Sequence, residues 1–230
     1  MGRARIPITD FLANLPLFDA LDHPALERIA AGASEFDAPR GTVIFHRDDR
    51  SAGVHVVVFG QIKVSLQTSR GDEKVVELID AGQMLGEAAM FLGRPYVASA
   101  EAIADSKLLH IAKDAVCLEV GRNPAFAQSM IANLSERLYA HLNDLELYAV
   151  SSGTQRVVRY LLNHEPDSGP NGTMSLTLPA KKWIIASRLN LTHEHFSRIL
   201  HDLIAGNLIE VDGRQVRIHD TTRLRSLAFE

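Results

Sequence analysis

The sequence contains almost no cysteine, and this shortage limits the chemistry that one chain can support. Cys117 is the only cysteine among 230 residues. An intramolecular disulfide is therefore excluded, and one chain cannot supply the four thiolates of an iron–sulfur cluster. Such sparing use of cysteine is typical of proteins from a reducing compartment.

Long hydrophobic runs are also absent. No uninterrupted apolar segment approaches the roughly 18 residues of a membrane span, and the N-terminal Met1-Gly2-Arg3-Ala4-Arg5 leads into no apolar signal core. We therefore expect no membrane partner and a cytoplasmic location. With 46% hydrophobic residues, the chain can still bury one large core or two modest ones.

Positive charge is scarce over most of the chain. Residues 1–150 carry 14 Lys and Arg against 20 Asp and Glu, whereas residues 151–230 carry 10 against 8. The same C-terminal part holds five of the ten histidines. A mildly basic end behind an acidic body predicts that any contact with nucleic acid is confined to the C-terminal part.

Two short helical patterns and a hairpin follow one another between Lys181 and Ile218. The first helix is expected over Lys182–Leu189, and Asn190-Leu191 makes a tight connection. Thr192 is a good N-cap for the second helix, whose buried stripe has the i, i+3, i+4, i+7 spacing and comprises Phe196, Ile199, Leu200 and Leu203. A two-residue Asp212-Gly213 turn, suited to type I′, joins the strands of the hairpin. This order predicts a winged helix-turn-helix.

The outer face of the second helix carries Glu194, Ser197 and Arg198 at i, i+3, i+4 spacing. Arginine can bind guanine O6 and N7, and glutamate can accept from cytosine N4, so this face is suited to the major groove. We also place Thr192, His193 and His195 at the DNA, because they open the same helix. The alternative is an ordinary solvated helix face.

A metalloenzyme is a second alternative, because His193-Glu194-His195 has the His-x-His spacing of cupin metal sites. On a helix, however, residues two apart point about 200° apart and cannot hold one ion. The helical His-Glu-x-x-His zinc motif does not fit either, since Ser197 occupies the place of its second histidine. We therefore expect no catalytic residues.

The period of the hydrophobic pattern changes to two over residues 42–111. After a helical lead-in over 10–33, interrupted at Pro16 and Pro24, we expect strands at Thr42–Phe45, Val54–Phe59, Ile62–Gln67, Lys74–Ile79, Ser99–Ala104 and Lys107–Ile111. Short strands with glycine at their ends indicate an antiparallel roll. Within it, Gly86-Glu87-Ala88-Ala89, hereafter the Gly-Glu cassette, is expected to begin a short helix whose backbone N–H groups face a ligand.

A long helix is expected from Asn123-Pro124 to about Ala149. Its apolar positions follow the heptad of a coiled-coil seam and comprise Ala127, Ile131, Leu134, Leu138, His141, Leu145 and Tyr148. Such a seam would pair two subunits into a homodimer. The alternative is that the stripe packs on the roll of its own chain. Ser151-Ser152-Gly153 ends this helix, and Thr154 is expected to cap the next one.

This order of parts resembles the CRP/FNR superfamily of bacterial transcription regulators over nearly the whole chain. Glu194-His195-Phe196-Ser197-Arg198 matches the Glu-x-x-Ser-Arg recognition helix of the FNR-like branch, and the segments 155–162 and 196–199 look like the Dnr-type denitrification regulators. The resemblance implies an α+β fold with a cyclic-nucleotide-binding-like roll (1–122), a dimerisation helix (123–150) and a winged helix-turn-helix (151–230). It further implies a homodimer that reads a TTGAT/ATCAA inverted repeat in double-stranded DNA, with RNA polymerase as a candidate further partner. The sequence favours neither of the two modes of action, activator or repressor, although activator is the one carried forward.

The resemblance also bears on the effector. In the cyclic AMP receptor protein, a Gly-Glu pair holds the ribose and an Arg-Ser pair holds the phosphate. Here Gly86 and Glu87 match, but the Arg-Ser position reads Tyr96-Val97, and Arg94 comes two positions early. A buried phosphate needs charge-assisted partners, so we expect an effector other than a cyclic nucleotide.

Dnr-type relatives are thought to sense nitric oxide through haem, which makes haem a candidate cofactor. The imidazoles available in the sensor half are His23, His46, His55, His110 and His141, and no spacing singles one out. A redox signal, a protein-borne signal and another small molecule stay open, as does a ligand-binding module without DNA function.

Overall fold

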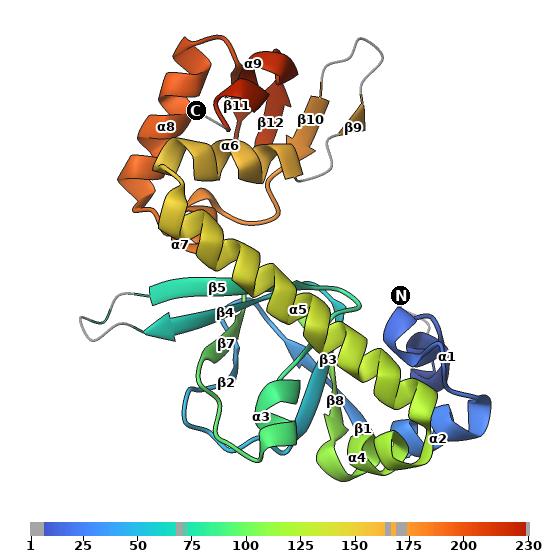
Figure 1. Cartoon of the computed structure of the whole chain (residues 1–230). Helices are drawn as coiled ribbons and strands as arrows, with labels where there is room; N and C mark the ends of the chain where they lie inside the picture. Colours follow the sequence, from blue (N-terminus) through green and yellow to red (C-terminus); the bar gives the residue numbers. More distant parts are fainter. Residues whose placement is uncertain (1–6, 68–70, 72, 164–166, 169–173, 229–230) are drawn as a thin grey trace, which may run out of the picture. The chain divides into compact units, whose positions relative to one another are not determined.

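The computed structural model describes residues 7–67, 71, 73–163, 167–168 and 174–228, and the chain divides into two compact units (Figure 1). The first comprises residues 1–72 and 76–139, and the second residues 73–75 and 140–230. The long helix α5 (Pro124–Val150) contributes to both units. The assignment of residues 123–150 to a dimerisation segment of their own stays a prediction.

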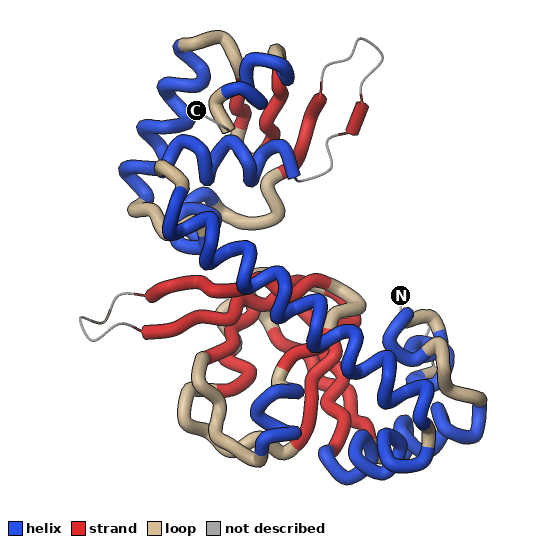
Figure 2. Tube along the Cα trace, in the orientation of Figure 1, coloured by secondary structure: helices blue, strands red, loops and turns tan. Residues whose placement is uncertain are grey.

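Two four-stranded sheets form the roll of the first unit (Figure 2). The order in one sheet, hereafter the inner sheet, is β1 (Ala33–Ala38), β8 (Ser106–Ala112), β3 (Gly53–Phe59) and β6 (Met84–Leu85). The order in the other is β2 (Val43–Phe45), β7 (Ser99–Ala102), β4 (Gln61–Gln67) and β5 (Glu73–Asp80). The six predicted strands are confirmed, whereas β1 and β6 were not predicted.

The inner sheet is covered on both faces, because alternate residues of a strand point to opposite sides. Val54 and Val56 of β3 belong to a core shared with the helices, which also contains Leu12, Phe18, Leu26, Ile29, Phe126 and Met130. Val57 belongs to a second core with residues of the other sheet, including Phe45, Ile62, Ala100 and Ala102. Both faces of β3 are therefore buried, which explains its valine-rich sequence.

Helices close the first unit around this sheet. The lead-in consists of α1 (Ile8–Ala13), a 3-10 turn at Pro16–Phe18 and α2 (His23–Ala31). Pro24 was expected to interrupt the lead-in, but it lies in the first turn of α2, which Asp22 caps by accepting from the backbone N–H of Ala25. Helix α4 (Lys113–Arg122) was not predicted. The expected short helix of the Gly-Glu cassette is α3 (Glu87–Leu92), preceded by Gly86 at φ 94°.

The predicted long helix is confirmed as α5. Asn123 caps its start, because its side-chain oxygen accepts from the backbone N–H groups of Ala125 and Phe126. Phe126 and Met130 are buried in the core shared with the inner sheet, which fixes the first turns of the helix on the roll. Within the described ranges, no helix has both the length and the apolar character needed to cross a membrane.

The second unit contains a four-stranded sheet and four further helices among its described residues. The helices are α6 (Gly153–Asn163), α7 (Lys182–Arg188), α8 (His193–Ala205) and α9 (Thr221–Ser226). The strands, in sheet order, are β11 (Ile209–Asp212), β12 (Gln215–Ile218), β10 (Met174–Thr177) and β9 (Asp167–Ser168). The predicted helix-turn-helix and hairpin are confirmed, and α9 was missed.

Two local predictions in this unit were wrong. Asp212 pairs with Gln215, so the hairpin turn is Gly213-Arg214 rather than Asp212-Gly213, and only Gly213 of the two has positive φ. Type I′ needs positive φ at both turn residues and is therefore excluded. The cap of α6 is Ser152, not Thr154, because Ser152 and Gln155 exchange side-chain to backbone hydrogen bonds in a capping box.

Candidate nucleic-acid interface and sensor site

Helix α8 has one buried and one exposed side, as its sequence pattern predicts. Phe196, Ile199, Leu200 and Leu203 are all buried. On the opposite side Glu194 and Arg198 are exposed and Ser197 is half-buried. The three side chains therefore share one accessible helix face, on which a cationic, a hydroxyl and an anionic group lie within one helical turn of each other.

The first turn of α8 is stabilised by its predicted cap. The Thr192 hydroxyl oxygen accepts from the backbone N–H of His195 at 3.2 Å. The Glu194 carboxylate accepts hydrogen bonds from the backbone N–H of Glu194 and from the Thr192 side chain. These hydrogen bonds hold the pKa of the Glu194 carboxyl below its usual value. Glu194 is therefore ionised at neutral pH and can act as a hydrogen-bond acceptor. His193 is exposed as expected, whereas the ring of His195 lies beside the start of α6, because a Cβ on Gly153 would come within 3.1 Å of it.

Arg156 is a residue of this unit that the sequence analysis did not single out. Its guanidinium donates to the carbonyl oxygens of Leu189 and Asn190, at 2.8 and 3.1 Å. These carbonyls belong to the turn between α7 and α8, where Asn190 has φ 57°. Arg156 thus links helix α6 to the turn between α7 and α8. The sequence offers no signal for this, since the partners are backbone atoms more than 30 residues away.

The cupin-like alternative is contradicted by the secondary structure. His193 and His195 lie on helix α8 rather than on a strand, so their side chains point away from each other. Among the described residues there is also no group of three His, Cys, Asp or Glu side chains placed to hold a metal ion.

Tyr96 fills the part of the sensor site where the resemblance would place a phosphate-binding arginine. Its ring is 5% exposed and stacks on Phe45, with ring centroids 3.7 Å apart. Its hydroxyl donates to Ser51 Oγ at 3.2 Å, and burial raises the pKa of this phenol. A Cβ on Gly86 would lie 3.4 Å from the Tyr96 ring, so the tyrosine packs directly against the Gly-Glu cassette.

The remaining effector residues do not converge on one place. Val97 is 76% exposed, and Arg94 is also exposed. Of the four residues predicted for the effector pocket, the structure therefore brings together Gly86, Glu87 and Tyr96 only. None of these supplies a positive charge for a bound anion.

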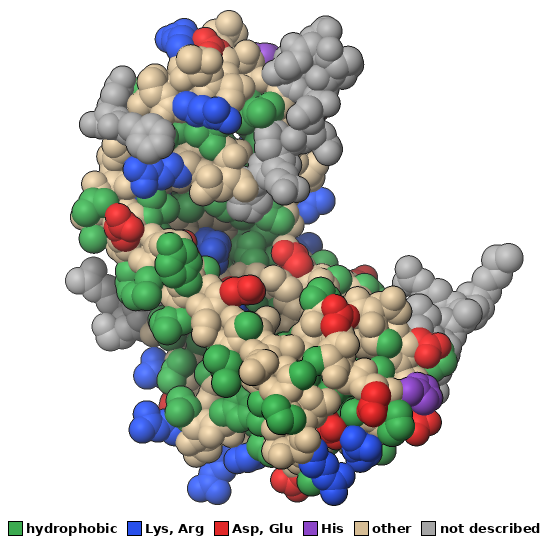
Figure 3. Space-filling view, turned by 45° about the vertical axis from the view of Figure 1, so that its right-hand side comes forward, with side chains coloured by type: hydrophobic (Ala, Val, Ile, Leu, Met, Phe, Trp, Pro, Cys, Tyr) green, Lys and Arg blue, Asp and Glu red, His purple; other side chains and the backbone are tan. Residues whose placement is uncertain are grey.

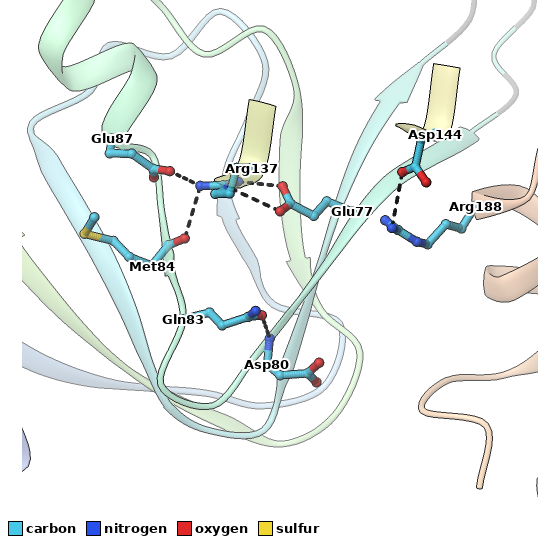
Figure 4. A network of polar contacts seen from close by, with 8 residues as sticks. All are labelled: Glu77, Asp80, Gln83, Met84, Glu87, Arg137, Asp144 and Arg188. Atoms are coloured by element: carbon cyan, nitrogen blue, oxygen red, sulfur yellow. Dashed lines mark hydrogen bonds and ion pairs between the residues drawn. The ribbon is translucent and has the colours of Figure 1, made fainter. Parts of the chain in front are cut away.

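The positive charge at the cassette comes instead from α5 (Figure 4). Arg137 binds Glu77 of β5 through two hydrogen bonds, of which Nε–Oε1 measures 3.1 Å, and it also forms an ion pair with Glu87. The Glu87 side chain is only 2% exposed. Its Oε2 atom has no hydrogen-bond partner in the part of the chain that the structure describes. Arg137 was missed because its partners lie 50 and 60 residues away.

The helix α5 leaves an apolar stripe accessible. Hydrophobic side chains reach the surface on the face drawn in Figure 3. Along α5 the exposed ones include Ile131 (64%), Leu138 (61%), Leu142 (54%) and Leu145 (62%), whereas Leu134 and His141 are half-buried. The alternative that the stripe packs on its own roll is thus contradicted for Ile131 and Leu138, which belong to the first unit. Leu142 extends the stripe and was missed.

Of the five candidate haem ligands, only His55 and His110 lie together. Their ring centroids are 5.0 Å apart, and His55 is packed between Phe36 and Phe45 at 5.9 Å from each. His55 is only 9% exposed, so a porphyrin could bind through it only if the neighbouring side chains moved. The pair as it lies in the structure therefore does not fit haem. His23 and His46 are exposed on the surface.

Comparisons with known proteins agree with the division of the chain. The cyclic nucleotide-binding domain matches residues 35–117, and the Crp-like helix-turn-helix domain matches residues 155–227. A CRP-like cAMP-activated global transcriptional regulator of Mycobacterium tuberculosis is 22% identical over 217 residues, which cover 94% of this chain and 97% of the relative.

Solved structures show the same fold. FixK2 from Bradyrhizobium japonicum superposes with a TM-score of 0.73 at 23% identity, covering 86% of this chain and 98% of that one. DNR from Pseudomonas aeruginosa is 28% identical with a TM-score of 0.52, covering 99% of this chain and 100% of that one. The matched domains and the relatives are those of transcription regulators rather than enzymes. With both domains matched in this order, the chain belongs to the CRP/FNR family of transcription regulators.

Proposed function

We propose that two copies of this chain form a regulator that reads an inverted repeat in double-stranded DNA. The observation that carries the proposal is the exposed face of α8, where Glu194, Ser197 and Arg198 lie together while the opposite face is buried. In a helix-turn-helix protein the second helix enters the major groove, and a dimer reads two half-sites one helical turn apart.

The proposed half-site is TTGAT, by resemblance to the FNR-like branch. Arg198 binds guanine O6 and N7, and the ionised Glu194 accepts from the amino group of the paired cytosine. Ser197 lies between them and contacts a thymine. Thr192 and His193, at the exposed start of α8, are placed to contact the backbone phosphates.

The proposed dimer contact is the exposed stripe of α5. Three of its members, Ile131, Leu138 and Leu145, are spaced by seven residues, and Leu142 lies between the last two. A repeat of seven is the spacing at which two helices keep one face toward each other. Exposed leucine and isoleucine in such a row bury apolar area when a second copy packs against them, and a two-fold axis would then relate the two copies of α8.

The proposed signal is something other than a cyclic nucleotide. Tyr96 takes the place of a phosphate-binding cation, and Arg137 already neutralises Glu87, the residue that would bind a ribose. A molecule entering at Glu87 has to compete with Arg137, which stands beside Leu138 of the stripe. Binding at the cassette and the position of α5 are thereby coupled through one ion pair.

The identity of the effector and of further partners rests on the resemblance alone. Haem with nitric oxide, action as an activator with RNA polymerase, and a cytoplasmic location are carried forward as proposals. For haem the test is direct: haem added to apoprotein should give a stoichiometric Soret shift, and nitric oxide should then change DNA affinity. Without that shift, the haem proposal is wrong.

The experiment that tests the DNA proposal uses the purified full chain and two labelled duplexes, measured by fluorescence anisotropy. One duplex carries the TTGAT/ATCAA inverted repeat, and the other carries the same bases in scrambled order. Specific binding to the repeat supports the proposal, and equal affinity for both duplexes contradicts it. A third arm adds cyclic AMP, which should leave both affinities unchanged; a large gain would overturn the assignment of the signal.

A further inference from the structure

Two histidines face each other on the inner sheet, apart from the Glu77, Glu87 and Arg137 cluster. His55 of β3 and His110 of β8 are direct cross-strand partners in the antiparallel pairing. Directly opposed residues have neighbouring Cβ atoms on the same face of a sheet. This face points into the core between the two sheets, since Val57 and Leu108, two residues along each strand, belong to that core.

The two rings are spaced as a shared metal ion requires. An imidazole nitrogen lies about 2.0–2.1 Å from a bound zinc ion, so the centroid of the ring lies about 3.2 Å from the metal. Two such rings in a tetrahedral arrangement then have centroids about 5 Å apart. The observed separation of the His55 and His110 centroids is 5.0 Å. The rings are inclined by 55° to each other, so they are not stacked face to face. Gly53 makes room for this arrangement, since a Cβ there would lie 2.9 Å from His110 Nε2.

A second observation is that one nitrogen of His55 lacks a hydrogen-bond partner among the described residues. The Nδ1 atom of His55 is buried and makes no hydrogen bond to any described residue, although His55 as a whole is only 9% exposed. A buried polar nitrogen is normally satisfied, and one that is not calls for an explanation such as a missing ion. His110 is half-buried, so an ion could reach the pair from the side of this residue.

The chemistry of the pair favours transition metals. Imidazole suits Zn²⁺, Cu²⁺ and Ni²⁺, whereas Ca²⁺ and Mg²⁺ prefer oxygen ligands. Burial lowers the pKa values of both histidines, that of His55 to about 4, so at neutral pH both rings are uncharged and no proton competes with a metal. No third His, Cys, Asp or Glu joins the pair among the described residues, which leaves the other coordination positions to water or a small ligand.

We propose that His55 and His110 form a two-imidazole site for a divalent transition-metal ion on the inner face of the roll. The proposal does not depend on DNA binding or on the identity of the effector. Phe36 and Phe45, both in ring contact with His55, would shield one side of the ion from water. The opposite, His110 side stays open for entry and for exchange of the remaining ligands.

The test is a cobalt titration of the full chain after treatment with EDTA. Tetrahedral Co²⁺ bound to imidazole absorbs visible light, so binding can be followed directly and then reversed with Zn²⁺. We expect one Co²⁺ per chain and a rise in the midpoint of thermal unfolding when Zn²⁺ is added. His110→Gln should weaken binding by about 10-fold or more, since even removal of an outer-shell partner has an effect of that size.

Two further variants complete the design. His55→Gln should also weaken binding, and if its buried glutamine prevents folding, the half-buried position of His110 still provides the decisive variant. His46→Gln is the matched control, because it removes an exposed imidazole of the same unit. No stoichiometric binding by the wild type, or binding that survives both His55→Gln and His110→Gln, would show that the pair is only a packing contact.

Discussion

The guanidinium of Arg137, on the long helix α5, forms an ion pair with the buried carboxylate of Glu87, the first residue of α3. The same guanidinium is held by Glu77 of β5. A residue of the proposed dimerisation helix thus neutralises the acidic group of the Gly-Glu cassette. The next residue, Leu138, is 61% exposed on the apolar stripe, so the ion pair and the proposed dimer contact lie on one short segment of α5.

Arg198→Ala should lower the affinity for the specific DNA sequence more than the affinity for other DNA. A good base contact contributes about 1–3 kcal/mol of discrimination, so specific affinity should fall roughly 10- to 100-fold while non-specific affinity changes less. Anisotropy titrations on the inverted repeat and on its scrambled version measure both. Arg225→Ala, which removes an exposed arginine of α9, is the matched control. An equal loss on both duplexes would assign Arg198 to a phosphate instead.

Leu138→Glu should move the protein from dimer toward monomer. The new carboxylate would be buried at a subunit contact in the dimer but hydrated in the monomer. Sedimentation should show a smaller species, and affinity for the inverted repeat should fall together with dimerisation. Asn143→Glu adds the same charge at an exposed polar position of α5 and should leave the dimer intact. A Leu138→Glu protein that stays dimeric would place the contact elsewhere.

Arg137→Leu should destabilise the first unit. The change removes the cation that pairs with the Glu87 carboxylate, whose side chain is only 2% exposed. Breaking such a pair from one side typically costs about 3 kcal/mol or more. Urea unfolding followed by circular dichroism measures the difference. In the double variant Arg137→Leu/Glu87→Leu, part of the stability should return, because the buried Glu87 carboxylate is then removed as well. Were the single variant as stable as the wild type, the ion pair would make no net contribution to the stability of the first unit.

Tyr96→Phe should change how stability depends on alkaline pH. Burial raises the pKa of the Tyr96 phenol in the folded chain, whereas the same phenol in the unfolded chain ionises near pH 10. The free energy of unfolding of the wild type therefore falls as the pH rises above that value. The free energy of unfolding of the variant should fall less, because the variant has no phenol at this position. Urea unfolding midpoints at neutral and alkaline pH provide the comparison. Tyr139→Phe, at a position 69% exposed, serves as the control and should follow the wild type.

The sequence predicted those features that depend on periodicity. The stripe Phe196, Ile199, Leu200 and Leu203 specifies one face of α8, and the exposed trio follows from it by geometry alone. Strands of the roll were predicted where alternation and glycine boundaries coincide. In contrast, β1 was missed because its sequence Ala-Ser-Glu-Phe-Asp-Ala contains few apolar residues, and its pairing with β8 supplies the order instead.

The long-range polar contacts could not be predicted from the sequence. No local pattern links Arg137 to Glu77 and Glu87, or Arg156 to the carbonyls of the turn before α8. His55 and His110 likewise became a pair only through the register of β3 and β8. Leu142 was not predicted because a strict heptad places His141, not Leu142, in the seam. In the structure Leu142 is 54% exposed, whereas His141 is half-buried.

The inner sheet also determines how the first unit unfolds. Val54 and Val56 belong to the core with the helices, and Val57 of the same strand belongs to the core between the sheets. Loss of β3 from the sheet would therefore remove buried side chains from both cores at once. Although the unit has two hydrophobic cores, heat or urea should therefore unfold it in a single cooperative transition rather than in two.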